Sequence, residues 1–68
     1  MTIQEKCLFI IKEFQLSARQ VGEAIGVSGS AASAKMKNEN YNKFEEKDLE
    51  NLRNFFIEKI NKIIKNTV

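Results

Sequence analysis

The chain contains no histidine, proline or tryptophan, three glycines and a single cysteine. The lack of histidine removes the usual general base and the usual zinc ligand. One cysteine, Cys7, cannot form a disulfide within the chain, and no signal-peptide pattern or long apolar run is present. We therefore expect a protein of the reducing cytoplasm that does not enter a membrane. The absence of proline and the scarcity of glycine favour helix.

The residues that are present suit one small domain, residues 1–68. A core of this size supplies only ~3–5 kcal/mol, so the chain needs ideal helix packing or a partner. No convergent pair of carboxylates is evident, and Cys7 is interpreted as a small buried apolar residue rather than a redox sensor. We therefore expect no enzyme, no metal, no cofactor and no small-molecule ligand.

The first helix is predicted from residue 3 to about residue 14. Thr2 and Glu5 have the spacing of a capping box, in which each side chain accepts the other residue's backbone N–H. The apolar residues that follow recur at helical spacing and form the expected inner face: Ile3, Cys7, Ile10, Ile11 and Phe14.

Two short helices joined by a tight turn are predicted within residues 17–36. Ser17 and Gln20 have the spacing of a second capping box, and Ser28 is the cap of the helix that follows. Gly26 ends the first of the two helices, because a residue at that position often takes the left-handed conformation that only glycine adopts without cost. This arrangement is a helix-turn-helix.

The spacing resembles that of the Cro/cI-type helix-turn-helix family of phage and bacterial regulators. The family's motif runs apolar, small, two variable residues, apolar, glycine, apolar, serine or threonine. The matching residues are Val21, Gly22, Glu23, Ala24, Ile25, Gly26, Val27 and Ser28. The resemblance implies an all-α, lambda repressor-like bundle of four or five helices with the motif at its centre. The position of Gly22 is expected to require a small residue because the second motif helix crosses closely there. Met36 is expected to close the core.

The resemblance also implies that the second motif helix, from Ser28 to about Lys37, enters the major groove of DNA. Carried over by position, its base-facing residues are Ser28, Gly29, Ser30, Ser33, Ala34 and Lys37. The sequence departs from the family here, because serine and alanine make none of the bidentate base contacts that longer side chains make. We expect modest, shape-based specificity or a thin helix that sinks deeper into the groove. Packing against another protein is the rival explanation of these small residues.

Positive charge is concentrated on the motif, since residues 17–43 hold four cations and two anions. The start of the first motif helix and the loop after the second are the places where phosphate contacts are expected. The candidates are Arg19, Gln20, Lys35, Asn40, Tyr41 and Lys43. Lys35 is expected to extend its ammonium toward a phosphate. Tyr41 lies in an asparagine-rich loop and is equally compatible with a lid on the core.

No helix breaker occurs from about residue 45 to residue 65, which predicts one long helix or two with a slight bend. Acidic residues at its start and lysines at its end suit the helix dipole. Its apolar stripe exceeds what three short helices can cover. We expect its first half to complete the monomer core and its second half to pack on a second copy of the chain through Phe56, Ile60, Ile63 and Ile64. Folding back as a fifth helix is the alternative.

Together these features predict a sequence-specific DNA-binding transcriptional regulator. The resemblance implies a Cro-like repressor of a phage or mobile element, which binds a pseudo-palindromic operator in double-stranded DNA as a homodimer with half-sites about one helical turn apart. Its mechanism would be occupancy, because two helices in successive major grooves block polymerase. The alternative is a helical protein-interaction module, such as an antirepressor or adaptor, that uses the small-residue helix and the terminal stripe.

Overall fold

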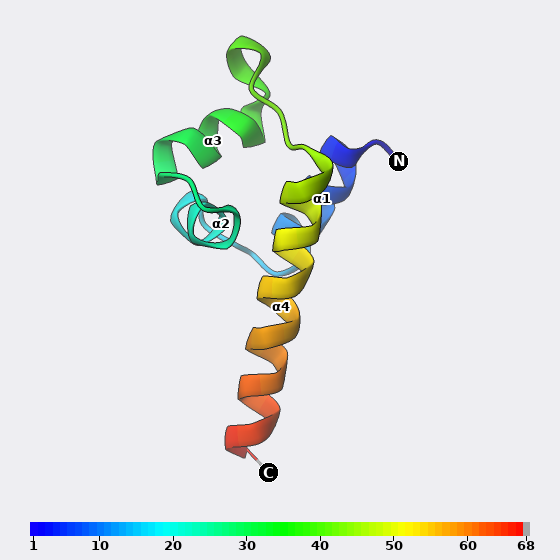
Figure 1. Cartoon of the computed structure of the whole chain (residues 1–68), viewed down its shortest axis with the longest axis vertical. Coiled ribbons are helices and arrows are strands. Elements are labelled where there is room, and N and C mark those ends of the chain that lie inside the picture. Colours follow the sequence, from blue (N-terminus) through cyan, green and yellow to red (C-terminus); the bar gives the residue numbers. More distant parts are fainter. Residues whose placement is uncertain (68) are drawn as a thin grey trace.

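The structure is a computed structural model that describes residues 1–67. Its helices are α1 (Ile3–Glu13), α2 (Ala18–Ile25), α3 (Gly29–Lys37) and α4 (Glu46–Thr67), with one 3₁₀ turn, Glu39–Tyr41, before α4. The first three helices gather around the first half of α4, and the second half extends beyond them (Figure 1). The described residues form no strand, which confirms the all-α bundle. Because α4 continues unbroken, there is no fifth helix folded back on the others within this range.

The helix starts follow the capping signals of the sequence. The Thr2 hydroxyl accepts the Glu5 N–H at 3.1 Å, and the Glu5 carboxylate accepts the Thr2 N–H at 3.0 Å. The Ser17 hydroxyl and the Gln20 carboxamide make the same exchange at 3.2 and 2.9 Å. Ser28 caps α3 through its hydroxyl, so all three predicted caps are confirmed. Each cap satisfies a backbone N–H that the helix itself leaves without an acceptor.

The turn between α2 and α3 explains Gly26, which ends α2, and Gly22, one helical turn earlier within α2. Gly26 has φ of 79°, in the left-handed region, as predicted, and its N–H donates to the Gly22 carbonyl at 2.8 Å. A Cβ at Gly22 would lie 2.6 Å from the carbonyl oxygen of Val27 and 3.1 Å from Ser28 backbone atoms. The group that requires a small residue here is therefore the backbone of the turn itself. The small residue at Gly22 was expected because of the crossing of α3, and the structure attributes it to the backbone of Val27 and Ser28.

The core lies between α1, α2, α3 and the first half of α4. Its buried residues come from every helix and from the segment before α4: Cys7, Ile11, Val21, Ile25, Ala32, Phe44, Leu49 and Leu52. Met36 packs against this cluster, as predicted. Cys7 has no exposed surface, which confirms that it is a buried apolar residue. Burial, with a smaller contribution from the negative charge of Asp48, raises the pKa of the Cys7 thiol to about 11. The thiol is therefore protonated and unreactive at neutral pH.

Phe56 corrects one expectation about α4. It was expected on a second copy of the chain, but only 7% of it is exposed, and its ring packs on Phe14 with the two centroids 3.9 Å apart. The monomer core therefore extends one helical turn further along α4 than expected. Phe14, expected on the inner face of α1, keeps about half of its surface exposed beside Phe56. Beyond Phe56, the isoleucines of α4 are exposed.

Gly22→Ala is expected to lower the free energy of unfolding by about 1–3 kcal/mol, because the added methyl group meets a backbone carbonyl that cannot move without reshaping the turn. Urea denaturation measures this change. Gly29→Ala is the matched control, since its Cβ would lie no closer than 3.6 Å to the Arg19 backbone. We expect the control to keep the stability or to raise it by about 0.4–1 kcal/mol. Equal losses in the two variants would contradict the close approach at Gly22.

Candidate nucleic-acid interface

One face of α3 points away from the protein. Ser30, Ser33, Ala34 and Lys37 follow the i, i+3, i+4, i+7 spacing of a single helical face, and each is exposed or partly exposed. The opposite face carries Ala32, which is fully buried. The outward face is therefore accessible to solvent, and four of the six residues expected to face bases lie on it.

The start of α3 is closer to α2 than expected. A Cβ at Gly29 would be 3.6 Å from the Cα of Arg19, so the side of Gly29 faces the first turn of α2 instead of solvent. Ser28 is exposed, and its hydroxyl accepts the Ala31 N–H at 3.1 Å. Gly29 therefore allows the N-terminal turns of α2 and α3 to approach each other closely.

Arg19 and Gln20 stand at the start of α2. The Arg19 side chain is exposed, and its Nε lies 3.9 Å from the Glu23 carboxylate, one helical turn later. An exposed pair at this distance is weak, so the guanidinium can exchange Glu23 for another anion. The Gln20 carboxamide oxygen accepts the Ser17 N–H, which leaves the amino group of that side chain as its donor to a ligand. Both residues remain in position for phosphate contacts.

Lys35 does not extend into solvent as expected. Its ammonium lies 2.9 Å from Oδ2 of Asp48, and the two side chains are only 19% and 3% exposed. The same carboxylate oxygen accepts the Glu45 N–H at 2.9 Å at the start of α4. Lys35 therefore joins α3 to α4 inside the protein, and its expected role as a phosphate contact does not agree with this geometry.

Gln4 is a second polar contact that holds α3, and the sequence analysis did not find it. Its amino group donates to the Lys35 carbonyl at 2.7 Å, and its carboxamide oxygen accepts the Phe44 N–H at 2.8 Å. One side chain of α1 thus satisfies backbone groups on both sides of the loop before α4. The only sequence signal is a polar residue next to the apolar face of α1, which is common on any helix.

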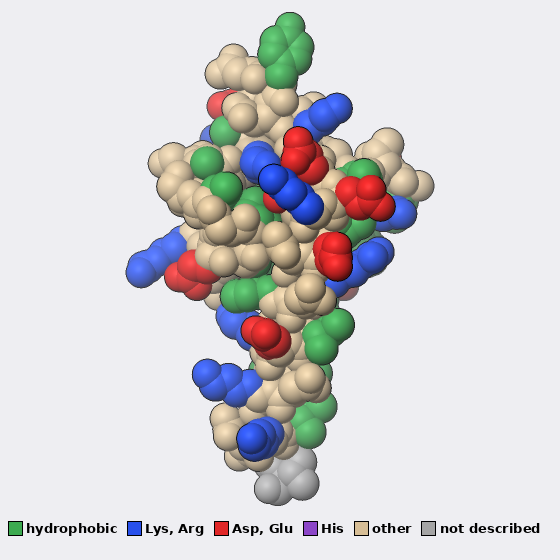
Figure 2. Space-filling model, in the orientation of Figure 1, with side chains coloured by type: hydrophobic (Ala, Val, Ile, Leu, Met, Phe, Trp, Pro, Cys, Tyr) green, Lys and Arg blue, Asp and Glu red, His purple; other side chains and the backbone are tan. Residues whose placement is uncertain are grey.

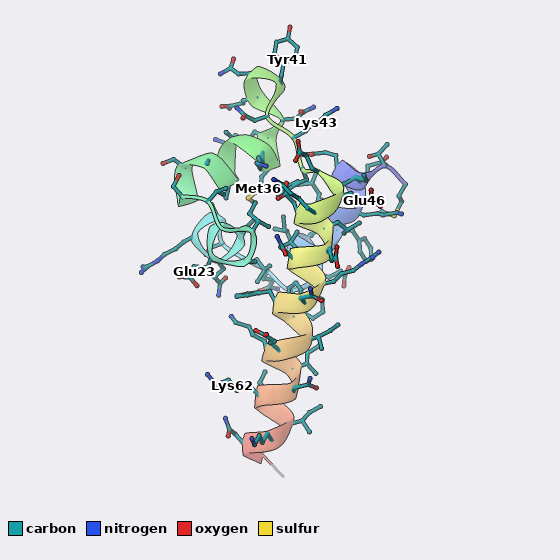
Figure 3. All side chains as sticks on the ribbon, viewed as in Figure 1. Glu23, Met36, Tyr41, Lys43, Glu46 and Lys62 are labelled. Carbon is teal, nitrogen blue, oxygen red and sulfur yellow. The ribbon has the colours of Figure 1, made fainter. Side chains whose placement is uncertain are left out.

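The loop after α3 is held in an unusual backbone conformation. Asn38, Asn40 and Tyr41 have φ of 56°, 50° and 66°, values that asparagine tolerates better than tyrosine does. Tyr41 is fully exposed, which excludes the lid on the core. Figure 3 shows Tyr41 at the tip of the loop above α3, with Lys43 on the segment that returns toward α4. Asn40, Tyr41 and Lys43 are all exposed beside the outward face of α3.

The surface over α3 carries few charged side chains. In Figure 2 this region, at the upper left, consists mainly of hydrophobic and other uncharged groups, with Lys and Arg side chains around it. Acidic side chains lie among the basic ones near the start of α4. Charge would therefore position a phosphate backbone from the edges of the site, and the centre would meet a ligand through small groups and backbone.

Comparisons with known proteins identify no relative. No protein-family model matches the chain, and searches of the curated proteins and of the solved structures gave no significant match. In the part of the chain that the structure describes, no helix has both the length and the apolar character needed to cross a membrane. Over the same residues, no group of three or more acidic or cysteine side chains is placed to hold a metal ion.

Lys35→Ala is expected to lower the free energy of unfolding by about 3 kcal/mol, because it leaves the Asp48 carboxylate buried without its cation. Thermal or urea denaturation measures the loss. Lys37→Ala, two residues later on the exposed face, is the matched control and is expected to change stability by less than about 0.5 kcal/mol. A Lys35→Ala variant as stable as the control would show that the ammonium is not held by Asp48.

Proposed function

We propose that this protein is a sequence-specific DNA-binding transcriptional regulator, a repressor of the Cro type that acts as a homodimer on a pseudo-palindromic operator. The observation that carries the proposal is the open outward face of α3, with Ser30, Ser33, Ala34 and Lys37 on it, in a turn geometry that the helix-turn-helix spacing predicts. The resemblance of residues 21–28 to the Cro/cI-type motif supports the same function.

The shape of α3 suits the major groove. The groove is about 12 Å wide, and a helix with ordinary side chains is about 10–12 Å across. Because the outward residues of α3 are small, its backbone can approach the base edges more closely than that of a helix with long side chains. Ser30 and Ser33 would then exchange hydrogen bonds with bases, Ala34 would touch a thymine methyl group, and Lys37 would bind a guanine or a phosphate.

Phosphate contacts would come from both ends of this face. Arg19 and the amino group of Gln20 would bind the backbone on one side, together with the N–H groups at the start of α2. Asn40, Tyr41 and Lys43 would bind it on the other, because they follow the end of α3 in the chain. Such contacts position the helix without reading sequence. In this proposal Lys35 supports the interface from within through Asp48 and makes no contact with DNA.

Repression would follow from occupancy. Two copies of α3 in successive major grooves would cover a promoter and exclude polymerase. The second candidate function is a protein-interaction module, an antirepressor or adaptor. The exposed isoleucines of α4 and the uncharged surface of α3 are the observations that favour it. The salt dependence of binding separates the two functions, because counterion release is specific to a polyanion.

Affinity for duplex DNA is expected to fall steeply as salt rises, and Arg19→Ala and Lys43→Ala are each expected to reduce the slope of log K against log salt by about one unit. Fluorescence anisotropy over a salt series measures the slope. Lys62→Ala is the matched control, because Lys62 lies on the protruding half of α4 away from α3 (Figure 3). Binding that is absent, or that does not depend on salt, would favour the protein-interaction module.

Ser30→Ala combined with Ser33→Ala is expected to change the preferred DNA sequence much more than the affinity for nonspecific DNA, because these hydroxyls would contact bases and not phosphates. Selection of bound duplexes from a random pool, with the wild type and the double variant in parallel, measures the preference. The wild type should recover a pseudo-palindrome. An identical motif from both proteins would remove these serines from the base-reading surface.

A further inference from the structure

The second half of α4 has a continuous apolar edge. Ile57, Ile60, Ile63 and Ile64 are 56%, 43%, 61% and 53% exposed. Figure 2 shows these hydrophobic groups along one edge of the protruding helix, with Lys side chains on the opposite edge. The edge begins at an open hollow of about 260 Å³ lined by Ile10, Phe14, Arg53, Phe56 and Ile57. A ridge and a hollow, both apolar, therefore lie next to each other on the same chain.

We propose that the hollow receives Ile64 of a second copy of the chain, with the two α4 helices packed antiparallel about a two-fold axis that passes beside Ile60. This inference rests on the proposed function, because it specifies how the dimer forms. A two-fold axis requires that the same patch be used on both copies. The ridge of each chain then fills the hollow of the other, and both isoleucine edges are covered at once.

The spacing along α4 sets this register. In an antiparallel pair centred on Ile60, residues at equal distances on either side face each other. Ile64 then lies level with Phe56 of the partner copy and, at about 100° per residue, on the same side of the contact as its Ile57, so it enters the hollow between these two residues. Ile63 lies level with Ile57 of the partner copy and on the same side as its Phe56. Phe56, in the hollow, is four residues before Ile60, and Ile64, which fills the partner's hollow, is four residues after it. A parallel pair would put hollow against hollow and ridge against ridge.

Charge favours the same arrangement. Arg53 stands at the rim of the hollow, seven residues before Ile60, and so faces the carbonyl end of the partner's α4. That end is the negative pole of the helix, which a guanidinium stabilises. Lys62 lies about 200° around α4 from Ile60, at about 100° per residue, so its ammonium stays on the outside of the pair.

The proposed axis gives the separation of the two α3 helices. Lys35 ties α3 to Asp48, which is twelve residues before Ile60 on α4. At a rise of ~1.5 Å per residue, Asp48 lies about 18 Å from the axis along α4, so the two copies of Asp48 lie about 36 Å apart in that direction. Half-sites one turn of DNA apart are separated by about 34–36 Å. This component along α4 is therefore about one turn of DNA, and the sideways offset of the two α4 helices adds to it.

The direction of α3 is also suitable. Asp48 and Ile60 differ by about 120° around α4, so α3 lies on the flank of the helix and not on the edge that the partner covers. A two-fold axis perpendicular to two antiparallel helices keeps the same flank of each helix on one side of the pair. Both α3 helices are then presented on one side of the dimer, as a single duplex requires.

Disulfide cross-linking of full-length variants tests the axis without DNA. Ile60→Cys places two thiols at the two-fold axis, so mild oxidation is expected to convert most of the chain to a covalent dimer on a non-reducing gel. Lys62→Cys is the matched control on the outer side and should stay monomeric on the gel. The native Cys7 does not interfere, because it is buried and its pKa is raised to about 11. Equal cross-linking of both variants, or a wild-type monomer in light scattering at high concentration, would overturn the proposal.

A mixture of Ile57→Cys and Ile64→Cys proteins tests the register. Residue 57 lies three residues before Ile60 and residue 64 lies four after it, so in the antiparallel pair the two positions differ by one residue along the axis. Two copies of residue 57 are offset by about 9 Å along α4, which is beyond the reach of a disulfide. The mixed dimer is therefore expected to exceed both homodimers. Preferential homodimers would indicate parallel packing and contradict the inference.

A DNA-binding measurement on the cross-linked protein separates failure of the proposed function from failure of the proposed α4 packing. The covalent Ile60→Cys dimer is expected to bind duplexes whose half-sites are about 10 base pairs apart more tightly than duplexes with an extra half turn between them. If the covalent dimer forms as expected but binds no duplex, the proposed function fails and the α4 packing stands. If the wild type binds duplex but the cross-links do not form, only the packing fails.

Discussion

The carboxylate of Asp48 joins the last turn of α3 to the first turn of α4. It accepts one hydrogen bond from the Lys35 ammonium and one from the Glu45 N–H, both at 2.9 Å. Gln4 of α1 reinforces this junction by bonding the Lys35 carbonyl. Ala32 is the one fully buried residue of α3, and Met36 adds apolar packing against the core, so the polar contacts at the end of the helix supplement a small apolar contact. The orientation of α3 depends on these polar contacts, which also determine where its outward face points relative to α4.

The small size of the α3 side chains has two consequences. These side chains leave the helix with a small apolar area to bury, and a buried ion pair and the Gln4 hydrogen bonds join its end to α4 and α1. They also leave its outward surface thin and uncharged, so a ligand would meet backbone and short hydroxyls at the centre and longer basic side chains at the edges. The close approach of Gly22 to the Val27 carbonyl has a related effect, because it fixes the angle between α2 and α3 through backbone atoms.

Phe56 divides α4 into two parts with different roles. Before it, Leu49 and Leu52 complete the core and are almost fully buried. After it, the apolar edge continues but the other helices do not cover it. The contact of Phe56 with Phe14 closes the core and at the same time forms the base of the hollow beside Ile57. A domain this small gains little from its own core, so covering the remaining edge with a second copy would add stability as well as symmetry.

Local signals in the sequence were sufficient for the helices and their ends. Capping boxes at Thr2 and Ser17, the cap at Ser28 and the left-handed Gly26 each depend on residues no more than four positions apart, so the chain itself specifies them. Helical spacing likewise identified the buried face of α1 and the apolar stripe of α4, whereas the outward residues of α3 were expected from the family resemblance.

The contacts between residues distant in the chain were decided only by the tertiary structure. Lys35 looked like a surface cation because nothing near it in the sequence reveals that Asp48, thirteen residues later, is buried beside it. Phe56 was expected on a partner because its spacing continues the stripe, and the spacing cannot show where α1 stops covering α4. Gln4 gave no specific signal, since its two partners, the Lys35 carbonyl and the Phe44 N–H, lie 31 and 40 residues away along the chain. Periodicity defines which side of a helix is apolar, but the length over which another helix covers that side depends on packing in three dimensions.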